Sequence, residues 1–196
     1  MKRLFFSMVM LFAASISFAQ VKSVKEAKSI AGASNPDFKK AEQLINAAMA
    51  DPTTQNNPET WNVAGIVQQK RVTKEMEKAY LRKPYDTMQI FNSALAMCEY
   101  FLKCDELAQI PDAKGKIAPQ YTDFVNLSYG QQFGQFYNAG AYFYGKENYE
   151  KSYHLFRMFI DAADRLYKAG MIPKDTVNVP VAAYNMSLCG MQMKKY

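Results

Sequence analysis

The stretch that decides the fold spans residues 136–162 and reads FYNAGAYFYGKENYEKSYHLFRMFIDA. Apolar side chains recur at helical spacing in its first half, at Phe136, Ala139, Gly140 and Phe143. A polar break over residues 146–148 precedes a second stripe with the same period, formed by Tyr149, Ser152, Phe156 and Phe159. The pattern predicts two antiparallel helices that approach closely at their small residues, because a helical glycine otherwise costs about 1 kcal/mol.

The same offsets recur in earlier parts of the chain. The first stripe is matched in spacing by Trp61, Ala64, Gly65 and Gln68. The second stripe is matched by Phe38, Ala41 and Ile45. A large residue followed by a small pair, and later a small residue four positions before an aromatic one, resembles the tetratricopeptide repeat (TPR). The resemblance implies an all-α fold of antiparallel helical hairpins, stacked as a right-handed superhelical array.

The copies depart from the regular spacing of that family. The aromatic residues that open each second helix lie 47, 64 and 47 residues apart, at Phe38, Tyr85, Tyr149 and Tyr196. The family's repeat is about 34 residues long, so we expect insertions within residues 72–83, 110–120 and 171–180. The last repeat also lacks its second helix. We expect its apolar face to be covered by further chain after Tyr196 or by self-association through the last helix.

Apolar periodicity, capping residues and breaks set the expected helix boundaries. They predict helices over residues 20–33, 38–51, 61–83, 88–102, 120–146, 148–167 and 181–194. The expected N-caps include Asn35, with Pro36 in the first turn, and Asp86. Residues 110–119 and 171–180 are expected to be loops, because each segment contains prolines at or near its ends.

The N-terminus has the three parts of a secretory signal peptide. Lys2 and Arg3 precede an apolar run over residues 4–18, and small residues stand before an expected cleavage site between Ala19 and Gln20. The run is shorter than the roughly 20 residues that a membrane span needs. We therefore expect residues 1–19 to be removed and residues 20–196 to form one TPR-like domain. The mature protein is expected in the periplasm or outside a bacterial cell, without stable membrane insertion.

Composition argues against several function classes. The formal net charge of +6 falls to +4 without Lys2 and Arg3, and the basic residues are interspersed with acidic ones, as in residues 70–83. This pattern indicates solvated helix faces rather than a nucleic-acid groove. His154 is the only histidine, and phosphate loops, nucleophile elbows and paired zinc-ligand spacings are absent from the sequence. We expect no enzyme activity, no metal and no cofactor.

The three cysteines do not form a disulfide framework, because their number is odd. Cys98 and Cys104 are too far apart along one helix for an undistorted bridge. A bridge from either of them to Cys189 stays open. The expected role of each is that of a small buried apolar residue.

The resemblance also implies a binding surface. In TPR proteins the first helix of each pair lines a concave groove, mainly at positions one, five and eight after its first large residue. Carried onto this chain, the positions are Asn62, Ile66, Gln69, Tyr137, Ala141, Tyr144, Tyr184, Leu188 and Met191. Tyr137 and Tyr144 lie off the apolar stripe of their hairpin, which favours exposure. Tyrosine, methionine and amide side chains suit a bound peptide, because they combine contact area with hydrogen-bonding groups.

We therefore expect an exported scaffold that binds a protein or peptide partner. Two alternatives stay open. An aromatic helical-repeat surface also suits a glycan- or nutrient-binding accessory protein of an outer-membrane uptake system, although the cleavage site lacks the cysteine of a lipoprotein. The other alternative is the front part of an enzyme whose catalytic domain lies beyond Tyr196.

Overall fold

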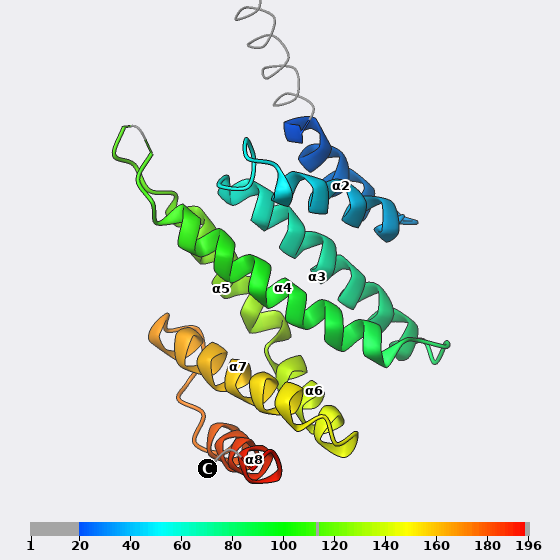
Figure 1. The fold of residues 1–196 in the computed structure, drawn as a ribbon, viewed down its shortest axis with the longest axis vertical. Helices are drawn as coiled ribbons and strands as arrows, with labels where there is room; N and C mark the ends of the chain where they lie inside the picture. The colour runs from blue at the N-terminus through cyan, green and yellow to red at the C-terminus, as the bar shows by residue number, and fades with distance from the viewer. Residues whose placement is uncertain (1–19, 113, 195–196) are drawn as a thin grey trace, which may run out of the picture. The chain divides into compact units, whose positions relative to one another are not determined.

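The computed structural model of the protein describes residues 20–112 and 114–194. Within these ranges the regular secondary structure is helical and contains no strand, as Figure 1 shows. The prediction of an all-α fold is confirmed. The predicted signal peptide, including Ala19, lies outside the described residues. No helix in the described ranges is long and apolar enough to cross a membrane.

The described residues form two compact units, where the sequence predicts one domain. The first unit comprises the chain up to Tyr85 together with Ala96–Tyr121. The second comprises Asp86–Leu95 together with the chain from Thr122 onward. The division passes through one continuous helix, α4 (Thr87–Ala108).

Each unit is a set of packed helices. The first unit contains a helix over residues 20–31, α2 (Phe38–Ala50), α3 (Pro58–Tyr80) and the later part of α4. The second unit contains the beginning of α4, most of α5 (Pro119–Gln132), α6 (Gly134–Gly145), α7 (Tyr149–Lys168) and α8 (Asn178–Gln192).

Side-chain caps fix several helix starts. The predicted cap Asp86 is confirmed, since its Oδ1 accepts a hydrogen bond from the Gln89 backbone N–H at 2.9 Å. The predicted cap Asn35 is wrong. The N-cap of α2 is Asp37, whose Oδ1 accepts from the backbone N–H of Lys40 at 3.0 Å. The helix therefore begins at Phe38, two residues after Pro36.

The predicted long helix over residues 120–146 is wrong, because it is divided into α5 and α6. Gly130 and Gly134 flank the break, and glycines lower the cost of departing from helical geometry. The backbone N–H of Phe136 donates to the carbonyl of Phe133 at 3.0 Å, a tighter turn than that of an α-helix.

The last helix starts earlier than predicted, at Asn178 rather than residue 181. Asp175 Oδ1 accepts hydrogen bonds from the backbone N–H groups of Val177 and Asn178, at 3.0 and 2.7 Å. Pro180 then lies in the first turn, where its missing N–H has no intrahelical partner to lose. The predicted loop over residues 171–180 is correspondingly shorter.

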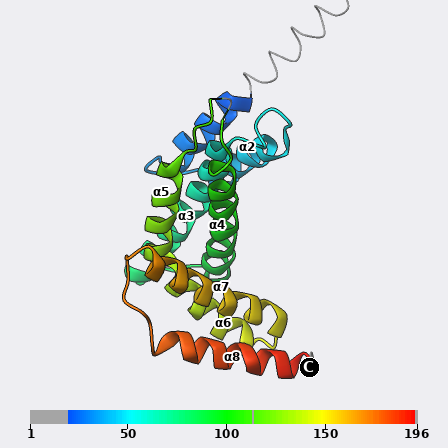
Figure 2. The ribbon, with the colours of Figure 1, turned by 90° about the vertical axis from the view of Figure 1, so that its left-hand side faces the viewer.

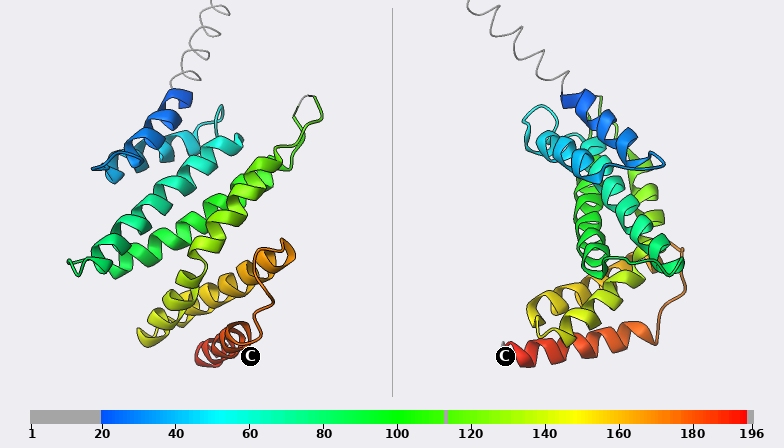
Figure 3. Two further views of the ribbon diagram at one scale, coloured as in Figure 1. Left: turned by 180° about the vertical axis from the view of Figure 1, so that it is seen from behind. Right: turned by 90° about the vertical axis from the view of Figure 1, so that its right-hand side faces the viewer.

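Close packing in the first unit centres on Gly65 of α3. A Cβ atom at Gly65 would lie 2.2 Å from Cε1 of the buried Phe101 on α4, so that only glycine admits the ring. The helix over residues 20–31 and α2 pack beside α3 (Figure 3) through a shared core. An ion pair between Arg71 Nη1 and Glu42 Oε1, at 2.6 Å, joins α3 to α2.

The second unit repeats this crossing at Gly140 of α6. A Cβ atom there would lie 2.9 Å from Cδ1 of Phe156 on α7. The Ser152 hydroxyl of α7 donates to the Gly140 carbonyl at 2.7 Å. The Cys189 thiol of α8 lies 3.3 Å from the same hydroxyl and donates to it. These contacts link α6, α7 and α8, which lie side by side in Figure 2.

One repeat alignment needs correction. If Tyr85 corresponds to Tyr149, then Asn92, seven residues later, corresponds to Phe156. The ring that packs against Gly65 belongs instead to Phe101. The reason is the length of α3, which continues to Tyr80 and moves the turn away from the crossing. Two antiparallel helices can both lengthen at the turn that joins them without changing where they cross. The two residues that meet at the crossing are then further apart in the sequence.

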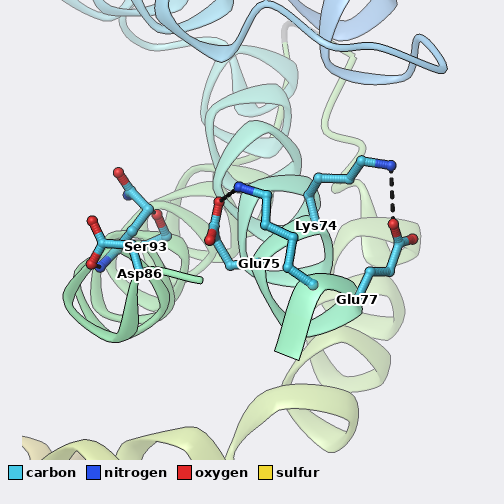
Figure 4. A network of polar contacts seen from close by, with 7 residues as sticks. Lys74, Glu75, Glu77, Asp86 and Ser93 are labelled. Carbon is cyan, nitrogen blue, oxygen red and sulfur yellow. Dashed lines mark hydrogen bonds and ion pairs between the residues drawn. The ribbon is translucent and has the colours of Figure 1, made fainter. Parts of the chain in front are cut away.

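The later turns of α3 form a solvated face, as the mixed charges of residues 70–83 predict. Lys74 Nζ forms an ion pair with Glu77 Oε2 at 3.0 Å, and Glu75 pairs with Lys78 (Figure 4). The Lys74–Glu77 pair is exposed on both sides and contributes little to stability, whereas the Glu75 side chain is largely covered. The alternating signs of the two pairs leave no continuous basic strip on this part of α3.

Candidate interaction surfaces

The outer side of α8 carries a stripe of apolar side chains. They follow one another at intervals of four and three residues, which places them along one side of a helix: Val177, Val181, Tyr184, Leu188 and Met191. Tyr184 is 63% exposed and Met191 is 61% exposed, whereas Leu188 is half-buried. We call these residues the α8 stripe. It brings together the three residues that the sequence predicts on the last helix.

The opposite side of α8 is packed. Ala182 and Cys189 are fully buried, and Cys189 contacts Ser152 of α7. These two positions lie two turns apart on one side of the helix, so α8 is held along its length. The α8 stripe is thus the exposed side of a helix whose other side is packed against its own unit.

The predicted residues on α6 are less accessible than the sequence suggests. Tyr137 is half-buried, and its ring packs edge-on against Phe156 and Phe159 at centroid distances of 5.5 and 5.4 Å. Tyr144 is half-buried against Tyr149, at 5.4 Å. Ala141 is exposed. Tyr137 therefore packs against the core of the hairpin. A position outside the apolar stripe of the sequence was not enough to make this side chain exposed.

The predicted residues on α3 belong to the first unit, whereas those on α6 and α8 belong to the second. Asn62 is buried, and its Nδ2 donates to Glu59 Oε2 at 3.0 Å. Ile66 and Gln69 are half-buried. The buried Asn62 is a structural hydrogen-bonding residue rather than an open contact for a ligand.

A polar cluster around Glu59 gives the first unit its main electrostatic feature. Glu59 Oε2 also accepts a hydrogen bond from the Tyr121 hydroxyl at 3.0 Å, and Oε1 accepts from Lys28 Nζ at 3.1 Å. Burial raises the pKa of Glu59, but the hydrogen bonds from Asn62, Lys28 and Tyr121 together outweigh it, so that the pKa lies below its usual value. Burial and the bond to Glu59 raise the pKa of Tyr121. The pair is a carboxylate and a neutral phenol at neutral pH.

Sequence reasoning missed this cluster. Glu59 and Tyr121 are 62 positions apart, so no local spacing connects them. The only local signal is the position of Glu59 in the first turn of α3, where an acidic side chain favours the helix start.

The thiol of Cys104 also lies near Glu59. Burial raises the pKa of Cys104 to about 12, and the charges of Asp105 and Glu59 act in the same direction. A protonated, buried thiol is a poor nucleophile and metal ligand. Cys98 and Cys189 are buried as well, and none of the three cysteines forms a disulfide in this structure. Their predicted role as small buried residues is confirmed.

A pocket of about 880 Å³ opens beside Tyr121 in the first unit. Leu107, Ile110, Pro111 and Ile117 supply an apolar wall, and polar groups come from the starts of α3 and α5, namely Asn56, Asn57 and Gln120. An apolar wall with a few converging polar groups is the usual composition of a small-molecule site. This pocket lies outside the predicted groove.

No group of three histidine, cysteine, aspartate or glutamate side chains in the described ranges could hold a metal ion. His154 is exposed on α7, beside a hollow of about 430 Å³ that Tyr153, Glu150, Gly190 and Met193 also line.

Comparison of the chain with protein-family models, curated proteins and solved structures finds no match. The features of the molecule that bear on its function are its surfaces. Of these, the α8 stripe has the simplest chemistry, because it offers exposed apolar area on a helix that its other face holds in place.

Proposed function

We propose that the chain is an exported, non-catalytic scaffold of the TPR-like type that binds a protein or peptide partner in the bacterial periplasm or outside the cell. The observation that carries the proposal is the exposure of the α8 stripe, with Tyr184 at 63% and Met191 at 61%. Scattered apolar residues on a surface need no explanation, but an ordered stripe along one helix is typical of a contact surface.

The energetics of this surface suit protein binding. Burying a large apolar side chain contributes about 1.5–3 kcal/mol relative to leaving it exposed. Tyr184 and Met191 are the residue types that are enriched at the centres of interfaces, since each combines a large contact area with a polar or polarisable group. A partner that covers both would gain roughly 3 kcal/mol from them alone.

The TPR-like part of the proposal rests on the repeated crossing. In each unit a helical glycine receives an aromatic ring from the antiparallel helix that follows, Phe101 at Gly65 and Phe156 at Gly140. A small residue that admits a large one is how paired helices of such repeats pack. Two occurrences in one chain support a common repeated unit.

The direct test is affinity capture from the native envelope, with the chain from Gln20 as bait. The double variant Tyr184→Glu/Met191→Glu should lose the captured partner, because two charges would be buried at the contact. Tyr80→Glu is the matched control, since Tyr80 is 89% exposed on α3. Equal capture by all three baits would remove the α8 stripe as the site. Tyr137 is unsuitable as a probe, because its ring supports Phe156 and Phe159.

The pocket beside Tyr121 favours a second candidate function, the binding of a glycan or similar nutrient. Its apolar wall suits the face of a sugar ring, and the amides of Asn56, Asn57 and Gln120 suit hydroxyl groups. Calorimetric titration with a panel of oligosaccharides tests it, with Gln120→Ala expected to weaken any binding. If no sugar produces heat, the pocket has no such role.

A further inference from the structure

We propose that the partner of the α8 stripe is a second copy of this chain, docked with its α8 antiparallel to the first. The proposal rests on the proposed function of the stripe and names its occupant. It follows from two properties of α8, the arrangement of large and small residues and the distribution of charge.

The surface of α8 is complementary to itself in shape. Each large residue in the middle of the stripe follows a small residue directly in the sequence: Ala183–Tyr184, Ser187–Leu188 and Gly190–Met191. Successive residues lie about 100° apart around a helix, so a row of small residues runs beside the row of large ones. A Cβ atom at Gly190 would meet nothing within 4 Å. When two such helices face each other, the large row of each can enter the small row of the other.

The chain uses the same kind of fit inside both units. Phe101 packs against Gly65 and Phe156 packs against Gly140, in each case between antiparallel helices. The surface of α8 presents both halves of such a fit on one helix, and the residues of α8 that its own unit buries fully, Ala182 and Cys189, lie on another side.

The charges point to an equal, antiparallel partner. α8 contains no charged residue between Asn178 and Gln192, so it offers an oppositely charged partner nothing to pair with. Lys174 and Asp175 precede the helix, and Lys194 follows it. The hydrogen bond from Asn178, with further ones from backbone N–H groups, lowers the pKa of Asp175, which is therefore anionic at neutral pH.

Orientation follows from these ends. Parallel pairing would place Lys194 of one copy beside Lys194 of the other and would align the two helix dipoles unfavourably. Antiparallel pairing separates the two Lys194 side chains and places each at the other copy's Lys174–Asp175 end, where one positive and one negative charge cancel, and it opposes the dipoles.

The test is sedimentation equilibrium of the chain from Gln20 over roughly 1–200 μM, the range that a small single-helix interface requires. The wild type and the control Tyr80→Glu should pass from monomer to dimer as concentration rises. Tyr184→Glu should weaken the dimer at least about 10-fold, with an unchanged helical circular dichroism spectrum. A monomer at all concentrations overturns the proposal.

Orientation is tested separately by mixing Val177→Cys with Met191→Cys under mild oxidation. Antiparallel pairing should give mainly the mixed disulfide, and mainly self-linked products would overturn it. Failure of the two proposals is distinguishable. A monomer that still captures a partner through the α8 stripe leaves the proposed function standing, and a monomer whose capture is unaffected by Tyr184→Glu removes both.

Discussion

The outer faces of the first described helix and of α8 differ sharply in chemistry. The helix over residues 20–31 buries Val24, Ala27 and Ala31, and its outer side carries the exposed lysines Lys22 and Lys25. α8 buries Ala182 and Cys189 and exposes an apolar stripe without a charge. Edge helices of helical arrays normally carry a polar outer face. The first helix has such a face and α8 does not, a difference that supports the proposal that the α8 stripe is a contact surface.

The same comparison shows what the two units share. Each unit is built on a glycine that admits an aromatic ring, and each ring is buried. The difference between the units thus lies in their outer surfaces and not in how their paired helices meet.

The largest effect is expected from removing the rings. Phe101→Ala and Phe156→Ala should each lower the free energy of unfolding by about 3–5 kcal/mol, since each leaves a cavity at a crossing. Chemical denaturation followed by circular dichroism measures the loss. Tyr80→Ala, at an exposed position, should change little. A loss below about 1 kcal/mol at either ring would mean that its crossing does not hold the unit together.

Adding a methyl group at the glycines should have the next largest effect. Gly65→Ala and Gly140→Ala should destabilise by about 1–3 kcal/mol through overpacking. Gly65→Ala should cost more, because the added atom would lie 2.2 Å from the ring instead of 2.9 Å. Gly145→Ala is the control, since nothing lies within 4 Å of its Cβ position, and it should not destabilise. The account of both crossings fails if all three variants unfold at the same temperature as the wild type.

Acid should weaken the first unit through Glu59. The pKa of Glu59 is lowered in the fold, so its contribution is present above the unfolded value of about 4.5 and is lost as the pH falls through the folded value. The contribution is on the order of 1 kcal/mol, because the carboxylate is only partly shielded from solvent. Denaturation at pH 7 and pH 3 should show this loss in the wild type and a smaller one in Glu59→Gln. Identical pH profiles would exclude Glu59 as its origin.

The smallest effect on stability is expected at the α8 stripe. Tyr184→Ser should change the free energy of unfolding by less than about 0.5 kcal/mol, because the side chain is largely exposed. Val24→Ser, on the buried side of the first helix, should cost more through loss of apolar burial. Thermal unfolding of both variants at low protein concentration makes the comparison. A Tyr184→Ser variant as unstable as Val24→Ser would show that Tyr184 belongs to the core.

Much of the fold could be predicted because the signals were local. Helical spacing around Gly140 and the cap at Asp86 define their elements within a few residues. The break at Phe133 could not be predicted, since the apolar pattern continues across it and isolated glycines also occur inside helices. The division of the chain into two units left no compositional mark, because it passes through α4.

The candidate site was predictable only in part. Offsets from Ala183 placed Tyr184 and Met191 on an accessible surface, because helical periodicity alone decides which side of a helix a residue occupies. Tyr137 and Asn62 could not be assigned correctly in this way. Their burial depends on Phe159 and Glu59, which come from another helix and from a neighbouring turn respectively.

The central claim is that the α8 stripe is a contact surface, and hydroxyl-radical footprinting of the chain from Gln20 tests it most directly. Oxidation of Tyr184, Met191 and Tyr80 would be measured by mass spectrometry at low and high protein concentration. The account predicts that Tyr184 and Met191 become protected as concentration rises while Tyr80 stays reactive. Unchanged reactivity of Tyr184 and Met191 at every concentration, and equally in the presence of captured partner, would contradict it.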